Sequence, residues 1–433
     1  MTETLAFTTP LDSDAGAGTS GTRAPRGSAS LRVLLIAPEP FSEPRGTPLN
    51  VIQMCRALTA AGHRVDLATY PLGRPAEMER LTVHPGYRVP GIHWVGIGFS
   101  GRKVALDVFL ALKVWQLLAS RRYDVVHAVE ESVFFALPAA RLARLPLIYD
   151  LDSSISHQLE YTDVVRNRLL LRLIRRAEAI ALRRSSLAIT VSTSLTRFAH
   201  ELSPGTPVVQ IEDTPVEEST RPPDMERVAE LRRGLGVGEA ACFVYTGNLE
   251  NYQGVRHLLQ AVPLVLAEAP AARFLFVGGD AAGVEALRRE ARALGVTHAV
   301  VFTGRRPANE MPEYMALATA LVSPRSEGHN TPLKIYTYMR SGRPIVASDR
   351  EAHTQVLDAG MAVLVPATPR GLADGMLRVL RDPAGSDRLG AAARACVEAR
   401  YCYPEFARKL LLAYSRVAPA AGSRTEAEAP PPG

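Results

Sequence analysis

A polar loop and a helix start between residues 322 and 349 carry the side chains best suited to anion binding. The segment VSPRSEGHNTPLKIYTYMRSGRPIVASD predicts a buried strand, a glycine-bearing loop, a helix opened by Thr331-Pro332, and another strand. Thr is a good N-cap, Pro is favoured in the first helical position, and Gly342 predicts a left-handed helix end. The helix would therefore leave the carboxyl end of a strand, where α/β sheets commonly bind anions.

Lys334 falls in the first turn of this predicted helix, where a cation opposes the helix dipole. A bound phosphate would relieve that conflict, so Lys334 is either a point charge on phosphate groups or a solvated surface lysine. Gly328, Asn330 and Thr331 lie in the same loop, whose backbone amides are further expected contacts. Asn330 alone could equally serve the turn.

A similar arrangement occurs near the beginning of the chain. The continuous apolar run 31–37 predicts a buried parallel strand, and the loop PEPFSEPRG leads to Thr47-Pro48 at the start of a helix. Arg45 stands beside this helix start as Lys334 does beside the other. Gly46 is needed if the backbone approaches a phosphate closely, and is otherwise a turn residue. One Thr-Pro pair could be plain capping, but two at equivalent places favour an anion site shared by two halves.

Length, charge and composition set the broad class. The chain has 433 residues, long enough for two α/β domains, and its 47% hydrophobic and 22% charged content is that of a globular protein. A net charge of +6 and a pI near 9.2 favour an anionic partner without choosing between a phosphorylated ligand, a lipid surface and nucleic acid.

Cysteine usage and hydropathy bear on the compartment. The four cysteines show no metal-ligand spacing, which suits free thiols in a reducing, cytoplasmic environment. No segment reaches the roughly 18 to 20 uninterrupted apolar residues of a membrane span, and the first thirty residues lack an apolar signal core. Residues 104–119 come nearest, but they contain Asp107 and Lys113 and predict an amphipathic helix.

The order of elements predicts two doubly wound parallel sheets. Strands are expected at 31–37, 64–69, 92–96, 125–128, 147–150, 187–191 and 208–211, and then at 241–246, 273–277, 300–303, 320–323, 344–347 and 362–365. The predicted division is a disordered tail (1–29), a Rossmann-like domain (30–211), a linker (212–223), a second Rossmann-like domain (224–402), a helix (403–417) and a second disordered tail (418–433).

These segments, taken together, resemble the family-4 glycosyltransferases over about residues 31–417. The resemblance is carried by RGTPLNVIQMCRALTAAGHRVDLAT, YDVVHAVEE, LPLIYDLDSS and LAITVSTSL in the first half. In the second half it is carried by VYTGNLENYQGVRHLLQAV, FLFVGGD, VVFTGRRPANEMPEYMALATALVSPRSEG and PLKIYTYMRSGRPIVASD. It implies the GT-B fold, with two Rossmann-like domains that face a central cleft.

The resemblance also implies an activity. The second domain would bind a nucleotide-sugar donor and the first an acceptor, for a hexosyltransferase that usually retains the anomeric configuration. The nucleotide sugar is the substrate, and neither a metal nor another cofactor is expected. The expected acceptor is a hydroxyl of a polysaccharide, a glycolipid or a small glycoside precursor, with nucleic acid not expected as a partner.

Several positions depart from the family pattern. The family usually grips the donor diphosphate with a basic pair after the first strand of the second domain, where this chain has Asn248, beside Gly247, and Gln253. Lys334 and Arg325 could supply the missing charge. Glu327 can stand for the first of the family's two glutamates, or be a solvated loop acid, whereas the second falls near Thr337.

Candidate acceptor-side residues follow two strands of the first half. Asp150 and Asp152 resemble the metal-binding DxD of another glycosyltransferase architecture, but in this layout they face the acceptor. His127 ends a strand, and Glu130 either orients or deprotonates the acceptor hydroxyl or merely suits a helix dipole. The predicted catalytic residues are thus Glu130, Glu327 and Lys334.

Residues 166–184, RNRLLLRLIRRAEAIALRR, combine seven arginines with Leu and Ile at helical intervals. Such a helix can lie on anionic lipid, which would place the protein at the inner face of a membrane, or be an ordinary domain helix with a basic face. Two rival functions remain open: a nucleotide-sugar epimerase on the same fold, and a catalytically inactive sugar-nucleotide-binding protein.

Overall fold

The first sheet consists of seven parallel strands in the order β3-β2-β1-β4-β5-β6-β7. In this computed structural model, the described residues are 30–41, 46–73, 77–96, 100–156, 159, 167–216 and 221–418. The apolar strands are mostly buried on both faces, as parallel strands covered by helices must be. Their bounds are β1 (Arg32–Ala37), β2 (Arg64–Thr69), β3 (Leu81–Pro85), β4 (Val125–Val129), β5 (Leu147–Leu151), β6 (Leu187–Thr190) and β7 (Val208–Gln210).

The second sheet has six parallel strands in the order β10-β9-β8-β11-β12-β13. In each sheet the order reverses beside the first strand, between β1 and β4 and between β8 and β11. Ligands of doubly wound sheets bind at such reversals. The bounds are β8 (Cys242–Thr246), β9 (Arg273–Val277), β10 (Val300–Gly304), β11 (Ala320–Ser323), β12 (Ile345–Ser348) and β13 (Val363–Val365).

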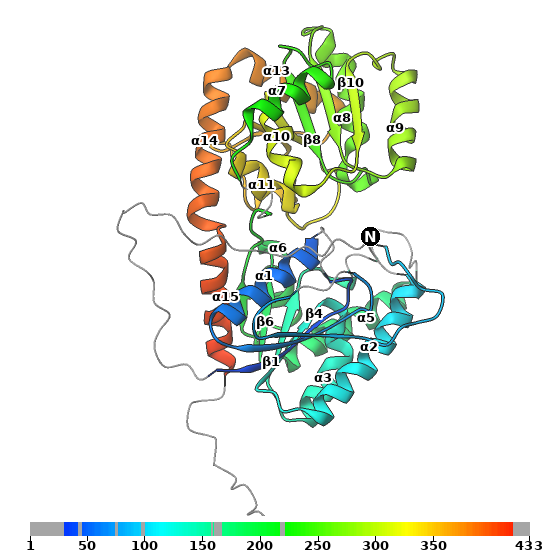
Figure 1. The fold of residues 1–433 in the computed structure, drawn as a ribbon, viewed down its shortest axis with the longest axis vertical. Helices are drawn as coiled ribbons and strands as arrows, with labels where there is room; N and C mark the ends of the chain where they lie inside the picture. The colour runs from blue at the N-terminus through cyan, green and yellow to red at the C-terminus, as the bar shows by residue number, and fades with distance from the viewer. Residues whose placement is uncertain are drawn as a thin grey trace, which may run out of the picture.

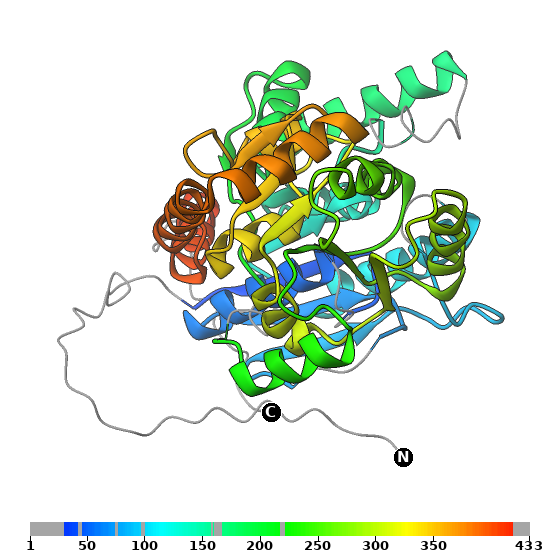
Figure 2. The ribbon, with the colours of Figure 1, turned by 90° about the horizontal axis from the view of Figure 1, so that it is seen from above.

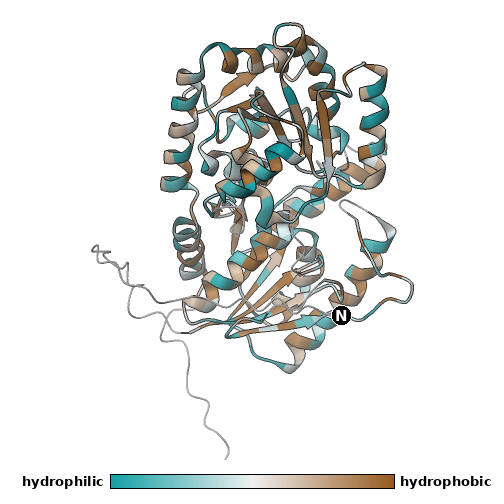
Figure 3. Cartoon of the chain, turned by 45° about the horizontal axis from the view of Figure 1, so that its top comes forward, coloured by the Kyte–Doolittle hydropathy of each residue, from teal (hydrophilic) through white to brown (hydrophobic). Residues whose placement is uncertain are grey.

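Helices cover both faces of each sheet (Figures 1 and 2). Around the first sheet lie α1 (Gly46–Ala60), α2 (Gly101–Ser120), η1 (Glu130–Ser132), α3 (Val133–Leu142), α5 (Arg168–Arg184) and α6 (Thr193–Leu202). Around the second lie α7 (Met225–Gly234), η3 (Asn251–Gln253), α8 (Val255–Leu266), α9 (Ala281–Ala293), η4 (Ala308–Glu310), α10 (Met311–Ala316), α11 (Leu333–Ser341), α12 (Glu351–Thr354), α13 (Pro369–Arg381) and α14 (Pro383–Arg400). Figure 3 shows largely apolar strands between helices that carry both hydrophilic and hydrophobic residues.

The last helix, α15 (Tyr403–Val417), returns to the first domain, as Figure 1 shows. It packs against α1, and its side chains Phe406, Leu410, Ala413 and Tyr414 are buried in the core on that side of the first sheet. The chain therefore passes between the domains twice, once through the segment after β7 and once from α14 to α15.

The strand predicted at 92–96 is wrong. Those residues form no regular element, although Val95 is buried, and the outer strand of the sheet is instead β3. Because β3 is an edge strand, its residues are only half-buried or exposed and alternate weakly, and it ends in Pro85. It therefore lacks the continuous apolar run that marked the inner strands. The predicted tails 1–29 and 419–433, and linker residues 217–220, lie outside the described residues.

Gly254 fixes the loop that follows β8 against the loop that follows β11. Its φ is +70°, and a Cβ there would lie 1.9 Å from the carbonyl oxygen of Pro324. Gly295 has the same φ of +70° and nothing within 4 Å of the corresponding position.

We expect Gly254→Ala to lower the free energy of unfolding by about 3 kcal/mol or more, because left-handed strain and backbone overlap add. Gly295→Ala should lose only the strain, about 1 kcal/mol. Thermal unfolding followed by calorimetry compares the two. Equal losses would show that the Gly254 loop yields to the added methyl group.

Candidate functional site

Helix α11 begins at the carboxyl edge of the second sheet, beside the reversal between β8 and β11. It starts at Leu333, so Lys334 lies in its first turn as predicted. Thr331 is not the N-cap: Pro332 occupies that place with an extended ψ of 131°, and no side chain caps the helix. Because the N-cap residue Pro332 has no polar side chain, the first amides of α11 have no side-chain acceptor. Gly342 ends the helix at φ 71°, as expected.

The ammonium of Lys334 is buried without a hydrogen-bond partner among the described residues. Its Nζ lies 4.0 Å from the centre of the Tyr245 ring, and a Cβ at Gly247 would lie 3.0 Å from it. Burial, and then the nearby Arg325 guanidinium, hold the pKa of Lys334 well below its ordinary value. The alternative of a solvated surface lysine is therefore wrong, and the position is a cation that lacks its anion.

Arg325 adds a second cation to the same place. Its Nε donates to the Glu327 carbonyl oxygen at 2.8 Å, and its guanidinium carbon lies 5.2 Å from the centre of the Tyr252 ring. Burial lowers the pKa of Arg325. Among the described residues, no carboxylate forms an ion pair with Arg325 or Lys334. Aromatic faces hold both groups instead, which leaves their charge to an incoming anion.

The loop after β8 is neutral, as the sequence indicated. The Asn248 side chain donates to the Tyr252 hydroxyl at 3.1 Å, and the Tyr245 hydroxyl donates to the Asn248 carbonyl. Gly247 has a φ of 137°, and the absence of a Cβ there leaves room for the Lys334 ammonium. This loop therefore contributes backbone and amide groups rather than charge.

The remaining residues predicted to bind the donor lie in the loop after β11, and they differ in burial and in contacts. Gly328 has a φ of 89°, and a Cβ there would approach the Arg325 guanidinium to 2.7 Å. Thr331 is buried and its Oγ1 has no hydrogen-bond partner among the described residues. The side chain of Glu327 is exposed, and its carboxylate forms no hydrogen bond or ion pair among the described residues. Asn330 reaches the first domain.

The first-domain edge contains a buried link between His127, Asp150 and α15. The two ring nitrogens of His127 lie 2.7 Å from the Tyr414 hydroxyl and 3.2 Å from Asp150 Oδ2. Both His127 and Asp150 are fully buried. His127 thus ties the last helix to the sheet and presents no free ring nitrogen to the cleft, whereas Oδ1 of Asp150 keeps an unused acceptor.

Asp152 lies where the two domains touch. Its backbone carbonyl accepts from Asn330 Nδ2 at 2.6 Å, and its Oδ1 is 3.4 Å from Asn50 Nδ2 in α1. Burial and the neighbouring carboxylates, Asp150 first, raise the pKa of Asp152 well above its ordinary value. The same causes raise the pKa of Asp213 to about 7. The first domain therefore offers carboxyl groups that hold protons near neutral pH, opposite a cationic loop.

Glu130 follows β4 with an unusual backbone. Its φ is +50°, a left-handed conformation that non-glycine residues adopt only at some cost. Its Oε1 accepts from the Ser153 hydroxyl at 2.7 Å, and its Oε2 lies 4.0 Å from the Lys103 ammonium. Lys103 also pairs with Glu131 at 2.5 Å, although burial still raises the pKa of Glu131 to about 7. Glu130 is thus fixed in direction by Ser153 and Lys103.

The second predicted helix start is described only in part. Helix α1 begins at Gly46, one residue before the predicted start, so Thr47 and Pro48 lie within its first turn. Gly46 is exposed and Thr47 half-buried. Arg45 lies outside the described residues. In the described part of the chain, no three His, Cys, Asp or Glu side chains are grouped as a metal site requires.

Several residues of the site gave no signal in the sequence. Tyr245 and Tyr252, which lie under the two cations, belong to an ordinary apolar strand and a short turn. Asp213 falls in a segment that the sequence predicts to be a linker, and Lys103 lies at the start of an amphipathic helix. Only Asn50, a buried polar residue one turn after Thr47, could have been noticed from its spacing.

Solved structures define the fold class as GT-B. The chain is similar to a sucrose-phosphate synthase of Thermosynechococcus elongatus, with a TM-score of 0.72 and 18% identity over 89% of this chain and 98% of that one. It is also similar to HepE of Anabaena, whose structure contains UDP, with a TM-score of 0.68 and 17% identity over 89% of this chain and 100% of that one. A third neighbour is WaaG, a glycosyltransferase involved in lipopolysaccharide biosynthesis, with a TM-score of 0.66 and 15% identity over 88% of this chain and 99% of that one.

Sequence comparison defines the family. Residues 45–211 match the sequence model described as Glycosyltransferase Family 4, and residues 240–382 match the one described as Glycosyl transferases group 1. The phosphatidyl-myo-inositol mannosyltransferase of Mycobacterium tuberculosis is 26% identical over 419 residues, 90% of this chain and 97% of that protein. A GDP-mannose-dependent alpha-(1-6)-phosphatidylinositol monomannoside mannosyltransferase of Mycolicibacterium smegmatis is 29% identical over 226 residues, 49% of this chain and 59% of that protein. The chain belongs to the family-4 glycosyltransferases, and it is an enzyme of that class.

We expect Lys334→Met to make the ligand-free protein more stable at neutral pH, by about 1 kcal/mol or more, because it removes a desolvated charge that has no partner. The pKa of Lys334 is lowered in the folded state, so the unfolded chain binds its proton more strongly. Wild-type stability therefore rises with pH between the lowered pKa and the ordinary one.

The difference between the free energies of unfolding of the wild type and Lys334→Met should therefore decrease as pH rises through that window. Urea unfolding at several pH values measures it. A less stable Lys334→Met protein at neutral pH would show that the ammonium is already compensated.

Proposed function

We propose that this glycosyltransferase moves a hexose from a nucleotide diphosphate sugar to a hydroxyl of a glycolipid. The unpartnered, buried ammonium of Lys334 beside Arg325 is the observation that carries the proposal. A diphosphate is the leaving group of such a transfer, and it develops negative charge at the place where two cations lack an anion. The mycobacterial relatives, whose names specify mannose transfer to phosphatidylinositol or its mannoside, make GDP-mannose the first donor to test.

Charge stabilisation of the leaving group is the main catalytic effect that this site can provide. Lys334, Arg325 and the uncapped first amides of α11 lie around one region, where Gly247 and Gly328 leave room for the two cationic side chains because they have no Cβ. Arg45, Gly46 and Thr47 would close on the same phosphates from α1. The nucleotide sugar is the substrate in this mechanism, without a metal or a further cofactor.

The acceptor would approach from the first domain. Carboxyl groups of Asp150, Asp152 and Asp213 lie together. The raised pKa values of Asp152 and Asp213 favour their protonated forms, which can both donate to and accept from sugar or inositol hydroxyls. Glu130, held by Ser153 and Lys103, orients the attacking hydroxyl, and Glu327 is assigned to hydroxyls of the donor sugar. We propose transfer with retention, in which the leaving diphosphate itself accepts the acceptor proton.

An inactive sugar-nucleotide binder is the second candidate, because of three specific positions. Asn248 and Gln253 are neutral where the family pattern has a basic pair, and Thr337 stands near the place of its second glutamate. Thr337 is buried with an unpartnered hydroxyl, and the Gln253 side-chain oxygen is also unpartnered among the described residues. Binding would then persist without turnover.

We expect Lys334→Ala to lower turnover about a hundredfold or more, as the loss of one electrostatic donor does in other enzymes. The control is Arg388→Ala, which removes a cation from the exposed side of α14. Release of GDP from GDP-mannose in the presence of phosphatidylinositol measures turnover, and NMR of the product gives its anomeric configuration.

Full turnover in Lys334→Ala would contradict the role of the lysine. Wild-type protein that binds GDP but releases none from the donor would favour the inactive binder. A new sugar nucleotide formed without acceptor would instead identify an epimerase.

A surface of α2, α3 and α5 suits contact with the membrane that carries such an acceptor. On α2, Val104, Val108, Leu112 and Trp115 recur on one helical face and are 43–56% exposed. On α5, Leu169, Leu173 and Ile180 share a face and are 52–64% exposed, among the arginines noted from the sequence. Because α3 packs against both helices, these faces belong to one side of the first domain (Figure 1).

We propose that this surface lies in the headgroup region of an anionic membrane, at its inner, cytoplasmic face. Apolar side chains together with basic ones are the composition of helices that bind in the plane of the interface. In the described part of the chain no helix is long and apolar enough to cross a bilayer. Contact would therefore be peripheral.

We expect the double substitution Leu112→Glu with Trp115→Glu to weaken binding to vesicles of phosphatidylglycerol and phosphatidylcholine at least about tenfold, because it removes apolar contact and adds repulsion. Met225→Glu on α7, at a residue 63% exposed on the second domain, is the matched control. Co-sedimentation measures binding. Equal sedimentation of the three proteins would exclude this surface.

A further inference from the structure

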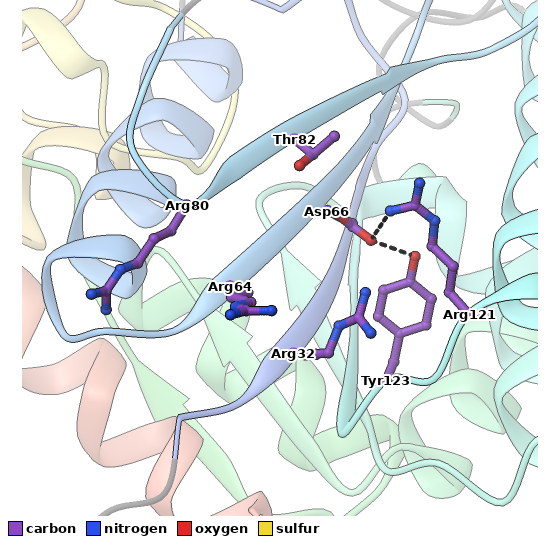
Figure 4. A pocket seen from close by; sticks show the side chains of 7 residues that line it. All are labelled: Arg32, Arg64, Asp66, Arg80, Thr82, Arg121 and Tyr123. Atoms are coloured by element: carbon purple, nitrogen blue, oxygen red, sulfur yellow. Dashed lines mark hydrogen bonds and ion pairs between the residues drawn. The ribbon is translucent and has the colours of Figure 1, made fainter. Parts of the chain in front are cut away.

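A second cationic site lies at the opposite edge of the first sheet from the cleft. A cavity of about 190 Å³ opens there at the amino ends of β1 and β2, just before β4 (Figure 4). Arg32 and Arg64 are the first residues of β1 and β2, Arg80 directly precedes β3, and Arg121 precedes β4. The carboxyl edges of these strands face the second domain, so this cavity is separate from the donor site.

The register of the strands brings two of these arginines together. Arg32 and Arg64 are paired residues of adjacent parallel strands, whose backbones lie about 4.8 Å apart. In-register neighbours project from the same face of a sheet, so the two guanidinium groups start from one side. Like charges in this position repel each other, and the repulsion must be screened by solvent or by an anion.

Asp66, the acidic residue that lines the cavity, already has partners on both of its carboxylate oxygens, although the one on Oδ1 is only a close approach. Asp66 Oδ2 accepts from Arg121 Nη1 at 3.2 Å and from the Tyr123 hydroxyl at 2.8 Å, and its Oδ1 lies 3.3 Å from His84 Nε2. Figure 4 shows the first two contacts on the side of the cavity nearest Tyr123. Asp66 therefore neutralises Arg121 and leaves the charge of Arg32 and Arg64 uncompensated.

Among the described residues, no carboxylate forms an ion pair with Arg32 or Arg64. The Arg32 guanidinium carbon lies 5.9 Å from the centre of the Tyr123 ring, which orients it without neutralising it. Arg80 contributes a third cation from a backbone with φ +63°, and it has one exposed ion pair with Glu79. The cavity thus combines an excess of guanidinium groups with room for a small ligand.

We propose that this cavity binds a phosphate-type oxyanion through Arg32 and Arg64, at a site distinct from that of the donor diphosphate. Guanidinium groups bind the oxygens of phosphates in a bidentate manner, and adjacent strands hold this pair in place. The volume suits a phosphate group with a small substituent rather than a whole nucleotide sugar, since sites for drug-sized ligands occupy roughly 300 Å³ or more. The inference does not depend on the transferase activity.

The test is isothermal titration of the full-length protein with inorganic phosphate at low ionic strength, in saturating GDP so that the donor site is occupied. We expect saturable binding that Arg64→Ala weakens at least about tenfold, that Arg64→Glu abolishes, and that Arg64→Lys partly preserves. Arg388→Ala, at another exposed arginine, should bind as the wild type does. Because Arg64 is exposed, these variants should fold, and their melting temperatures check that they do.

Wild-type phosphate binding in both Arg64→Ala and Arg64→Glu would overturn the proposal, as would the absence of saturable binding in the wild type. A second arm identifies the source of the oxyanion. If a lipid headgroup supplies it, Arg64→Ala should also weaken sedimentation with vesicles containing phosphatidic acid. If a free phosphorylated molecule supplies it, vesicle binding should stay unchanged while phosphate binding is lost.

Discussion

A buried ammonium without a carboxylate is the constraint around which the second domain is arranged. Desolvating a charge costs several kcal/mol, and proteins usually meet that cost with an ion pair. Here Lys334 is held by the face of Tyr245, by the open backbone at Gly247 and by its place in the first turn of α11. Arg325 adds a second positive charge rather than relieving the first. The free protein thus keeps an unfavourable arrangement that a diphosphate would turn into a favourable one.

The first domain has the opposite excess, of carboxyl groups rather than cations. Asp150 and Asp152 are buried and Asp213 is half-buried, and burial first, then the neighbouring carboxylates, raises the pKa values of Asp152 and Asp213. The domains meet through direct contacts such as Asn330 to Asp152 and Gln355 to the backbone of Ser194. Arg197 forms an ion pair with Glu351 across the same boundary. Two cations in the second domain, opposite carboxyl groups of raised pKa in the first, favour a ligand that is anionic at one end and rich in hydroxyls at the other.

The sequence predicted the fold better than the site. Buried parallel strands are continuous apolar runs, so all but one of the expected strands were found, and the exception failed because β3 is a half-exposed edge. The order of motifs predicted the family, and the loop before Lys334 predicted a cationic helix start. What could not be predicted depends on contacts between distant residues. The burial of Lys334 requires Tyr245, and the engagement of His127 requires Tyr414, almost three hundred positions later. Spacing along a chain carries no information about such partners.

The return of α15 to the first domain affects how this protein can be made. Phe406, Leu410 and Tyr414 complete the core beside α1 and β1. The core of the first domain therefore cannot be completed until α15 has been synthesised. During synthesis that apolar face stays open until α15 (Tyr403–Val417) has left the ribosome. Exposed apolar surface of this kind invites aggregation, and chaperones act on it. The first domain is thus first to be translated, yet its core is among the last parts to be completed.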